Sequence, residues 1–222
     1  MESAREKLRA GLLKCPAYPI LDTTTLAIHG ADEWLDTVLS SGVRIVQLRL
    51  KNANEAYFQY VARKFIAKCN EFSAVSILND RLDIALTLGA GGVHLGLADA
   101  LIMDARAAAI RKLGVHTSFI IGGSARTVDH ARSLADAGAT YLGCGACYQT
   151  QTKDDTVHIG VARLTEIAKS VRIPIVGIGG VSWGNFHEVL LAGALGFAAI
   201  SMFLHPLDEI ESHLDKLNSG KR

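Results

Sequence analysis

Four stretches of the chain repeat one pattern of polar and apolar positions, in which a helical segment ends at glycine and an apolar strand follows. They are "LSSGVRIVQLRL", "LTLGAGGVHLGL", "LADAGATYLGCG" and "LLAGALGFAAIS". Glycine suits the left-handed residue that closes a helix, and unbroken apolar strands are typical of a parallel sheet covered on both faces. The repeats lie at Gly42, Gly89, Gly138 and Gly193, a spacing of roughly twice the ~25 residues that one strand and one helix occupy.

Further apolar runs fill the intervals between these repeats, namely "AVSIL", "SFIIG" and "IPIVGIGG". The pattern therefore predicts eight strands, at Tyr18–Leu21, Ile45–Leu48, Val75–Leu78, Gly92–Leu95, Ser118–Ile121, Tyr141–Cys144, Ile175–Ile178 and Phe197–Ile200. Strands that alternate with helices favour an α/β fold, a single (β/α)8 TIM barrel over residues 1–222. Residues 1–17 are expected to form an N-terminal extension or helix. An open doubly wound sheet is the alternative, but no G-x-G-x-x-G follows the first strand.

Composition and charge narrow the kind of protein. A chain of 222 residues with 49% hydrophobic content buries a large core, and a net charge of +1 gives no overall field for nucleic acid or an anionic membrane. The N-terminal "MESAREKLRAGLLKC" lacks the apolar run of a secretion signal, and no stretch has the length of a membrane span. Four cysteines without a regular framework fit a reducing compartment. We expect a cytoplasmic protein.

Polar side chains and glycines gather where the expected strands end, and in a barrel these ends share one rim. In chain order, the residues at these strand ends that we single out are Gln47, Arg49, Lys51, Asn79, Asp80, Asp99, Ser124, Thr150, Thr152, Lys153, Gly180, Ile200 and Ser201. Strand alternation puts Gln47, Arg49 and Lys51 on one face. Cations beside two carboxylates suit a magnesium diphosphate, and the glycine-rich "VGIGGVS" suits a phosphate held by backbone N–H groups.

Each of these residues also has an ordinary structural interpretation. Asp80 would cap a helix that starts at Arg81, Asp99 would cap a helix through Ala105 to Leu113, and Arg49 would pair with a neighbouring acid. The polar stretch Gln149–His158 is long enough to be a functional loop, a candidate lid. Two phosphate sites at one rim would imply two phosphorylated ligands.

The motifs in this order resemble the thiamine-phosphate synthase family. The resemblance rests on "VQLRLKN", "LNDRLDIALTLGAGGVHLG", "GGSARTVDHA", "QTQTKDD", "VGIGGVS" and "GFAAIS", with Asp99 downstream of Asp80, and runs from Tyr18 to Phe203. It implies a TIM-barrel transferase that joins hydroxymethylpyrimidine diphosphate to hydroxyethylthiazole phosphate and releases diphosphate. Thiamine phosphate would be the product.

The resemblance also implies a role for each matched residue. The pyrimidine diphosphate would be held by Gln47, Arg49, Lys51, Asn79, Ser124 and Lys153, and the thiazole phosphate by Thr150, Thr152, Gly180, Ile200 and Ser201. Asp80 and Asp99 would ligate Mg²⁺, and Arg49, Lys51 and Lys153 would act in catalysis by neutralising the leaving diphosphate. The partners would be two small-molecule substrates, without nucleic acid or membrane, and a homo-oligomer is possible.

Some residues depart from the family pattern or suggest other chemistry. Leu97 and Ala98 stand where the family has a polar and an acidic residue, and Ala146 stands where it usually has proline. "CGAC", Cys144 to Cys147, looks like a redox pair but lies between a strand and a polar loop. His94, inside a strand, is interpreted as a satisfied core or rim residue. A thiazole-phosphate tautomerase-like barrel and a non-catalytic thiamine-phosphate binder stay open as alternative functions.

Overall fold

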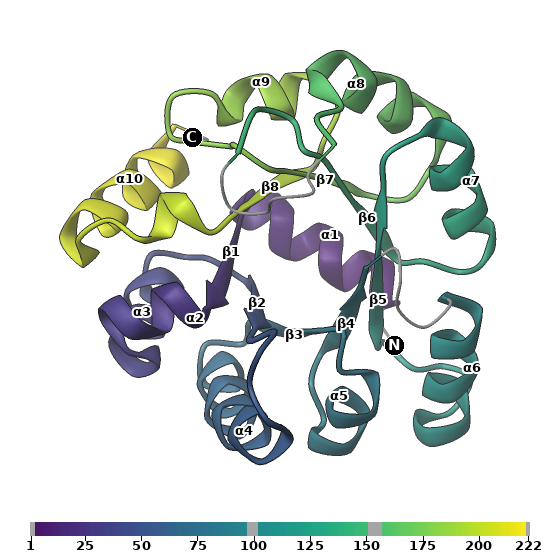
Figure 1. The fold of residues 1–222 in the computed structure, drawn as a ribbon, viewed down its shortest axis with the longest axis horizontal. Coiled ribbons are helices and arrows are strands. Elements are labelled where there is room, and N and C mark those ends of the chain that lie inside the picture. Colours follow the sequence, from purple (N-terminus) through teal and green to yellow (C-terminus); the bar gives the residue numbers. More distant parts are fainter. Residues whose placement is uncertain (1–2, 97–101, 151–156, 221–222) are drawn as a thin grey trace.

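Eight parallel strands close into a barrel in the computed structural model, which describes residues 3–96, 102–150 and 157–220. Each strand pairs with the next one along the chain, and β1 pairs with β8 (Figure 1). The strands are β1 (Ala17–Asp22), β2 (Ile45–Arg49), β3 (Val75–Asn79), β4 (Gly92–Leu95), β5 (Ile120–Ala125), β6 (Tyr141–Cys144), β7 (Ile175–Ile178) and β8 (Gly196–Ala199). The predicted TIM barrel is confirmed.

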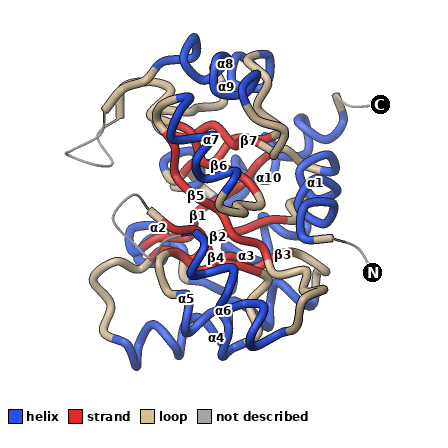
Figure 2. The backbone as a smooth tube through the Cα atoms, turned by 90° about the vertical axis from the view of Figure 1, so that its right-hand side faces the viewer, coloured by secondary structure: helices blue, strands red, loops and turns tan. Residues whose placement is uncertain are grey.

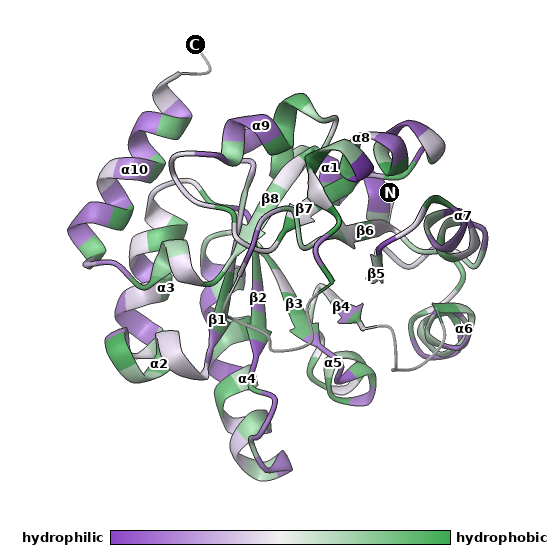
Figure 3. Ribbon diagram, turned by 45° about the horizontal axis from the view of Figure 1, so that its top comes forward, coloured by the Kyte–Doolittle hydropathy of each residue, from purple (hydrophilic) through white to green (hydrophobic). Residues whose placement is uncertain are grey.

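Helices surround the barrel and cover the outer faces of the strands. They are α2 (Thr23–His29), α3 (Ala31–Ser40), α4 (Glu55–Glu71), α5 (Leu82–Leu88), α6 (Ile102–Leu113), α7 (Val128–Asp136), α8 (Gly160–Ser170), α9 (Phe186–Leu191) and α10 (Leu207–Ser219), with a 3-10 turn η1 (Ser201–Phe203). These helices carry hydrophilic residues beside hydrophobic ones (Figure 3), as expected for helices with one buried face. Trp34, Phe58 and Phe65 are fully buried between this ring and the strands.

One further helix, α1 (Ala4–Lys14), packs against the barrel where the strands begin rather than in the ring. Its buried Leu8 and Leu12 join a second core with Ile45, Ile120 and Val176, separate from the core under the outer helices. Seen from the side, α1 lies on the right of the strands, whereas α2, which follows the end of β1, lies on the left (Figure 2). The helix therefore seals the amino end of the barrel.

The fifth strand differs from the sequence prediction. It was expected at Ser118–Ile121, but β5 runs from Ile120 to Ala125, so Ser124 lies inside the strand rather than after it. The two glycines Gly122 and Gly123 suggest a strand end, yet both are paired on each side in the sheet. Gly122 is needed inside the strand because a Cβ there would overlap the ring of Tyr141.

None of the helices in the described parts of the chain is long and apolar enough to cross a membrane.

Candidate active site at the barrel mouth

The interior of the barrel carries a row of polar side chains below its carboxyl end. Strand register places Asn79 of β3 beside His94 of β4, and Ser124 of β5 follows two positions after the residue paired with His94. Gln47 of β2 is almost fully buried, while Asn79, His94 and Ser124 are partly exposed. Three predicted site residues, Gln47, Asn79 and Ser124, therefore share one interior surface.

A chain of four hydrogen bonds joins Gln47 to Ser124 across the barrel. Gln47 Nε2 donates to Tyr18 Oη at 3.1 Å, and the hydroxyls of Tyr18 and Tyr141 lie 2.8 Å apart. Tyr141 Oη lies 3.0 Å from His94 Nδ1, and His94 Nε2 lies 3.0 Å from Ser124 Oγ. Tyr18 and Tyr141 were not predicted as site residues, because each looks like an ordinary residue of an apolar strand.

Tyr18 and Tyr141, the two tyrosines in this chain of hydrogen bonds, are fully buried, and burial raises the pKa of each. Desolvation raises the pKa of Tyr18 and that of Tyr141, in each case well above the ordinary value, because the phenolate would lose its hydration. Each phenol is therefore protonated at neutral pH and carries one hydroxyl proton. His94 is a hydrogen-bonded rim residue, in agreement with the interpretation from the sequence.

Asp80 lies directly after β3 in a conformation that non-glycine residues rarely adopt. Its φ is +63°, in the left-handed region, and its carboxylate oxygens accept hydrogen bonds from the Asn79 side-chain amide and from Gly96 N at 3.3 Å. Its own N–H donates to His94 O at 2.9 Å. Helix α5 starts at Leu82 with Arg81 at the N-cap position, so Asp80 lies one residue before the cap position that its ordinary structural interpretation requires. Backbone strain of this kind is typical of functional positions.

The two cations at the carboxyl end of β2, Arg49 and Lys51, differ in their surroundings. Arg49, at the end of the strand, is partly exposed and pairs in register with Asp22, whereas Lys51 is exposed in the turn that follows. The buried Asp22 carboxylate accepts from Thr25 N at 2.9 Å and caps α2. No ion pair joins Arg49 to an acid within the described residues, so the expected structural pairing of Arg49 is absent from that part of the chain.

Two glycines bring the backbone close to neighbouring segments at the rim after β7. Gly179 and Gly180 have φ values of +90° and +66°, and a Cβ at Gly180 would overlap the backbone oxygen of Gln149. Tyr148 N donates to Gly179 O at 3.0 Å, so the segment after β6 lies against this turn. Ile200 and Ser201 lie at the start of η1, after β8, and Thr150 is partly exposed.

Three predicted site residues, Asp99, Thr152 and Lys153, lie outside the described residues. The convergence of Asp80 and Asp99 on one ion stays a prediction. Within the described parts of the chain, no group of three or more His, Cys, Asp or Glu side chains is close enough to hold a metal.

The "CGAC" cysteines do not have the environment of a redox pair. Cys144 and Cys147 are buried and free, and desolvation raises the pKa of the Cys144 thiol to about 12 and that of Cys147 to about 11. Reactive thiols instead have a lowered pKa and some exposure.

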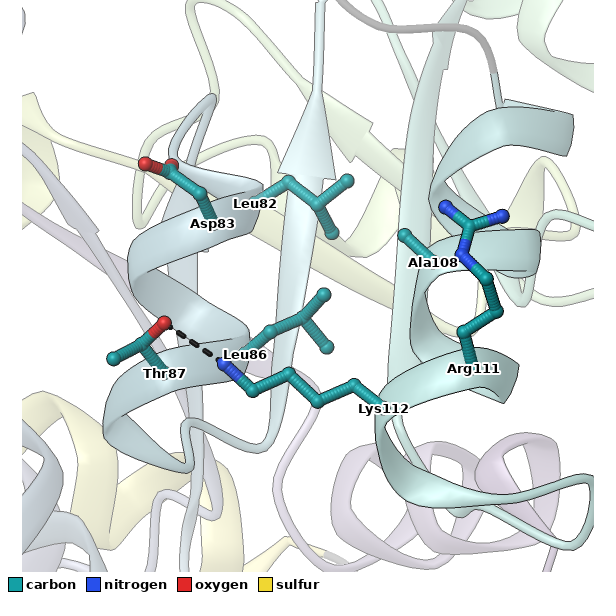
Figure 4. A pocket seen from close by; sticks show the side chains of 7 residues that line it. All are labelled: Leu82, Asp83, Leu86, Thr87, Ala108, Arg111 and Lys112. Atoms are coloured by element: carbon teal, nitrogen blue, oxygen red, sulfur yellow. Dashed lines mark hydrogen bonds between the residues drawn. The ribbon is translucent and has the colours of Figure 1, made fainter.

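A surface pocket lies on the flank of the molecule, between α5 and α6 (Figure 4). It is lined by Leu82, Asp83, Leu86, Thr87, Ala108, Arg111 and Lys112, and Lys112 Nζ donates to Thr87 Oγ1 at 2.9 Å. None of these residues belongs to the predicted site, so the barrel mouth remains the candidate active site.

The fold and the mouth define the class of protein: a (β/α)8 barrel with polar side chains at the carboxyl ends of its strands, where barrel enzymes carry out their chemistry. The family model for thiamine monophosphate synthase matches residues 17–203. The chain belongs to this family and is a transferase of thiamine biosynthesis.

Similar proteins cover most of the chain. It is 43% identical over 164 residues to the thiamine-phosphate synthase of Methanospirillum hungatei, covering 73% of this chain and 77% of the relative. The enzyme of the same name from Caldivirga maquilingensis is 38% identical over 173 residues, covering 78% and 81%. The solved structure of thiamine phosphate pyrophosphorylase from Pyrococcus furiosus aligns with a TM-score of 0.81 at 31% identity, over 96% of this chain and 98% of that one.

Proposed function

We propose that the protein joins hydroxymethylpyrimidine diphosphate to hydroxyethylthiazole phosphate and releases diphosphate and thiamine phosphate. Family membership over residues 17–203 supports the class of reaction. The observation that carries the proposal is Asp80, whose carboxylate is held in a strained, left-handed position at the tip of β3. A residue in this conformation persists only when the surrounding structure fixes it, and Asp80 lies directly after the carboxyl end of β3.

The diphosphate would lie at the β2–β4 side of the mouth. Asp80 offers hard carboxylate oxygens, the ligands that Mg²⁺ prefers, and the Asn79 amide and Gly96 N–H orient this group. Asp80 and Asp99 would hold Mg²⁺, which would supply positive charge to the leaving diphosphate. Arg49, Lys51 and Lys153 would neutralise the rest of that charge.

The pyrimidine ring would lie over the interior polar row, in reach of Gln47, Asn79 and Ser124. The thiazole phosphate would lie on the opposite side of the mouth, at Thr150, Thr152, Gly180, Ile200 and Ser201. The positive φ values of Gly179 and Gly180 support this placement, because such turns can direct successive N–H groups toward an anion.

The reaction then needs binding and charge stabilisation more than proton transfer. The C–O bond to diphosphate breaks, the aminopyrimidine stabilises the resulting benzyl-like cation, and the thiazole nitrogen attacks the same carbon. The bonding pair leaves with diphosphate, so no base has to remove a proton in this step. Arg49, Lys51 and Lys153 therefore act by stabilising charge as it develops.

An assay of diphosphate release tests this function against its alternatives. With both substrates and magnesium, the synthase releases diphosphate in an amount equal to the thiamine phosphate formed. A tautomerase-like barrel would change the thiazole phosphate alone, and a non-catalytic binder would bind without turnover. Either of these results without diphosphate release would refute the proposal. A cytoplasmic location is also proposed, supported by Cys69, Cys144 and Cys147, which are buried thiols.

A further inference from the structure

The hydrogen-bond chain from Gln47 to Ser124 contains three residues that the proposed function does not use. Tyr18 and Tyr141 are each 1% exposed, and they come from β1 and β6, on different sides of the barrel interior. Neither has another hydrogen-bond partner among the residues that the structure describes. His94, from β4, connects Tyr141 to Ser124.

Two glycines, Gly122 and Gly143, make room for the side chains of this hydrogen-bond chain. A Cβ at Gly122 would lie 2.6 Å from Tyr141 Oη, and one at Gly143 would lie 3.1 Å from His94 Cε1. Both glycines are in the middle of strands, where glycine otherwise weakens a sheet. Their positions are therefore explained by the two rings that fill the space beside them.

The four hydrogen bonds run in one donor-to-acceptor direction, because each hydroxyl has only one proton to donate. Gln47 Nε2 donates to Tyr18, so the proton of Tyr18 goes to Tyr141 and the proton of Tyr141 goes to His94 Nδ1. His94 then carries its proton on Nε2 and donates to Ser124 Oγ. The Ser124 hydroxyl keeps its own proton to donate to a ligand.

The reversed chain would present the opposite groups to a ligand. Ser124 would donate to His94 Nε2, and the Gln47 amide would turn so that its oxygen accepts from Tyr18. Gln47 would then offer only N–H groups, and Ser124 would offer only lone pairs. In the inferred direction, Oε1 of Gln47 is not used by the hydrogen-bond chain and can accept a hydrogen bond.

We propose that Tyr18, Tyr141 and His94 are positioning residues, which fix the hydrogen-bonding direction of Gln47 and Ser124 and so select an aminopyrimidine over an oxopyrimidine. This inference rests on the proposed function. An exocyclic amino group donates to Gln47 Oε1, and the adjacent ring nitrogen accepts the second Nε2 proton. An oxo group with a protonated ring nitrogen would place acceptor against acceptor and donor against donor, which buried sites reject strongly.

The test compares Tyr141→Phe with Tyr60→Phe, a change at an exposed tyrosine of α4. Each variant is assayed with the aminopyrimidine diphosphate and with its oxo analogue. We expect Tyr141→Phe to lower kcat/KM for the amino substrate roughly tenfold, and to lower the amino-to-oxo preference by at least about tenfold, with the KM for thiazole phosphate unchanged. Tyr60→Phe should change neither. An unchanged preference in a folded Tyr141→Phe variant would overturn the proposal.

Tyr18→Phe provides a second variant in case Tyr141→Phe folds poorly. Because the chain acts as one unit, the preference lost in Tyr18→Phe/Tyr141→Phe should equal that of the larger single variant. Additive losses would mean that the two hydroxyls act separately and would refute a continuous chain.

The proton position on His94 gives a readout that needs no substrate. Nitrogen-15 NMR of the wild-type protein should show the Nε2-protonated form of His94, and Tyr141→Phe should produce a mixture of forms. The Nδ1-protonated form in the wild type would contradict the inferred direction. Absence of diphosphate release by the wild type would refute the proposed function, whereas this spectrum tests the chain independently.

Discussion

The two ends of the barrel are built from different side chains. At the amino end, Leu8 and Leu12 of α1 meet Ile45 and Ile120, and the contact is apolar throughout. At the carboxyl end the same strands carry polar groups, and Asp80 is held there in a strained conformation. The first end excludes water and the second admits it, so changes at the amino end should alter stability and changes at the carboxyl end should alter turnover.

The largest effect should come from Asp80→Asn. Asparagine tolerates the left-handed conformation but removes the carboxylate charge, so kcat/KM should fall by at least about a hundredfold while the free energy of unfolding stays nearly constant. The measurement is diphosphate release at saturating magnesium, with unfolding in denaturant measured in parallel.

Ser73→Asn is the matched control for this variant. Ser73 also has a positive φ, +52°, but precedes β3 at the amino end. It should leave kcat/KM unchanged. Wild-type turnover by Asp80→Asn would refute a role for the carboxylate.

At the amino end of the barrel, where α1 packs, we expect a loss of stability without a loss of turnover. Leu8 is fully buried, and Leu8→Ala should lower the free energy of unfolding by about 2–5 kcal/mol, because a cavity replaces packed side-chain atoms. The folded fraction should keep the wild-type kcat/KM. The exposed Leu13→Ala on the same helix is the control and should cost much less. If Leu8→Ala changed turnover but not stability, the division of roles between the ends would be wrong.

Glycine replacements at the two ends should separate backbone strain from ligand binding. Gly180→Ala would place a Cβ against the Gln149 carbonyl oxygen, so we expect the KM for thiazole phosphate to rise roughly tenfold. Gly89, at the end of α5, has a similar φ of +72°, but a Cβ added there would meet nothing within 4 Å. Gly89→Ala is therefore the control. It should lower stability by about 1 kcal/mol without changing KM. Equal effects on KM would contradict the proposed phosphate site.

The smallest expected effect is a pH dependence of stability that comes from buried thiols. It should be alike for Cys69 and for Cys144. Burial raises the pKa of Cys69 and that of Cys144 to about 12, so the folded protein keeps these protons at a pH where the unfolded chain loses them. Stability should therefore be constant below about pH 9 and fall as the pH rises toward 12. Unfolding in denaturant at pH 8 and pH 10 measures this, and Cys144→Ala should reduce the difference. A rise in stability over this range would contradict the sign.

The sequence predicts the barrel well because its repeats are regular. Seven of the predicted strands, beginning with Tyr18–Leu21, overlap the observed ones almost completely, since apolar runs bounded by glycine mark buried parallel strands clearly. Helix α1 was expected only as an extension or helix. Its packing across the barrel could not be read from its own residues, because the apolar surface that it covers comes from several distant strands.

The candidate site was predicted only in part. Polar residues at strand ends stand out, so Gln47, Asn79 and Asp80 could be found from the sequence. Tyr18 and Tyr141 could not, because a tyrosine in an apolar strand looks the same whether its hydroxyl is part of a network or only satisfied. The signal was indirect: Gly122, within a strand, leaves room for a ring that belongs to a neighbouring strand.

Because α1 packs on residues from distant strands, it is made before the surface that it covers is complete. Leu8 and Leu12 are made well before other members of the core they join, Val176 and Ala198 among them. At about 5–20 residues per second, the nascent helix waits roughly 10–40 s for its complete binding surface. During that interval its apolar face is without its native partner, so a helix made before the barrel strands docks after them.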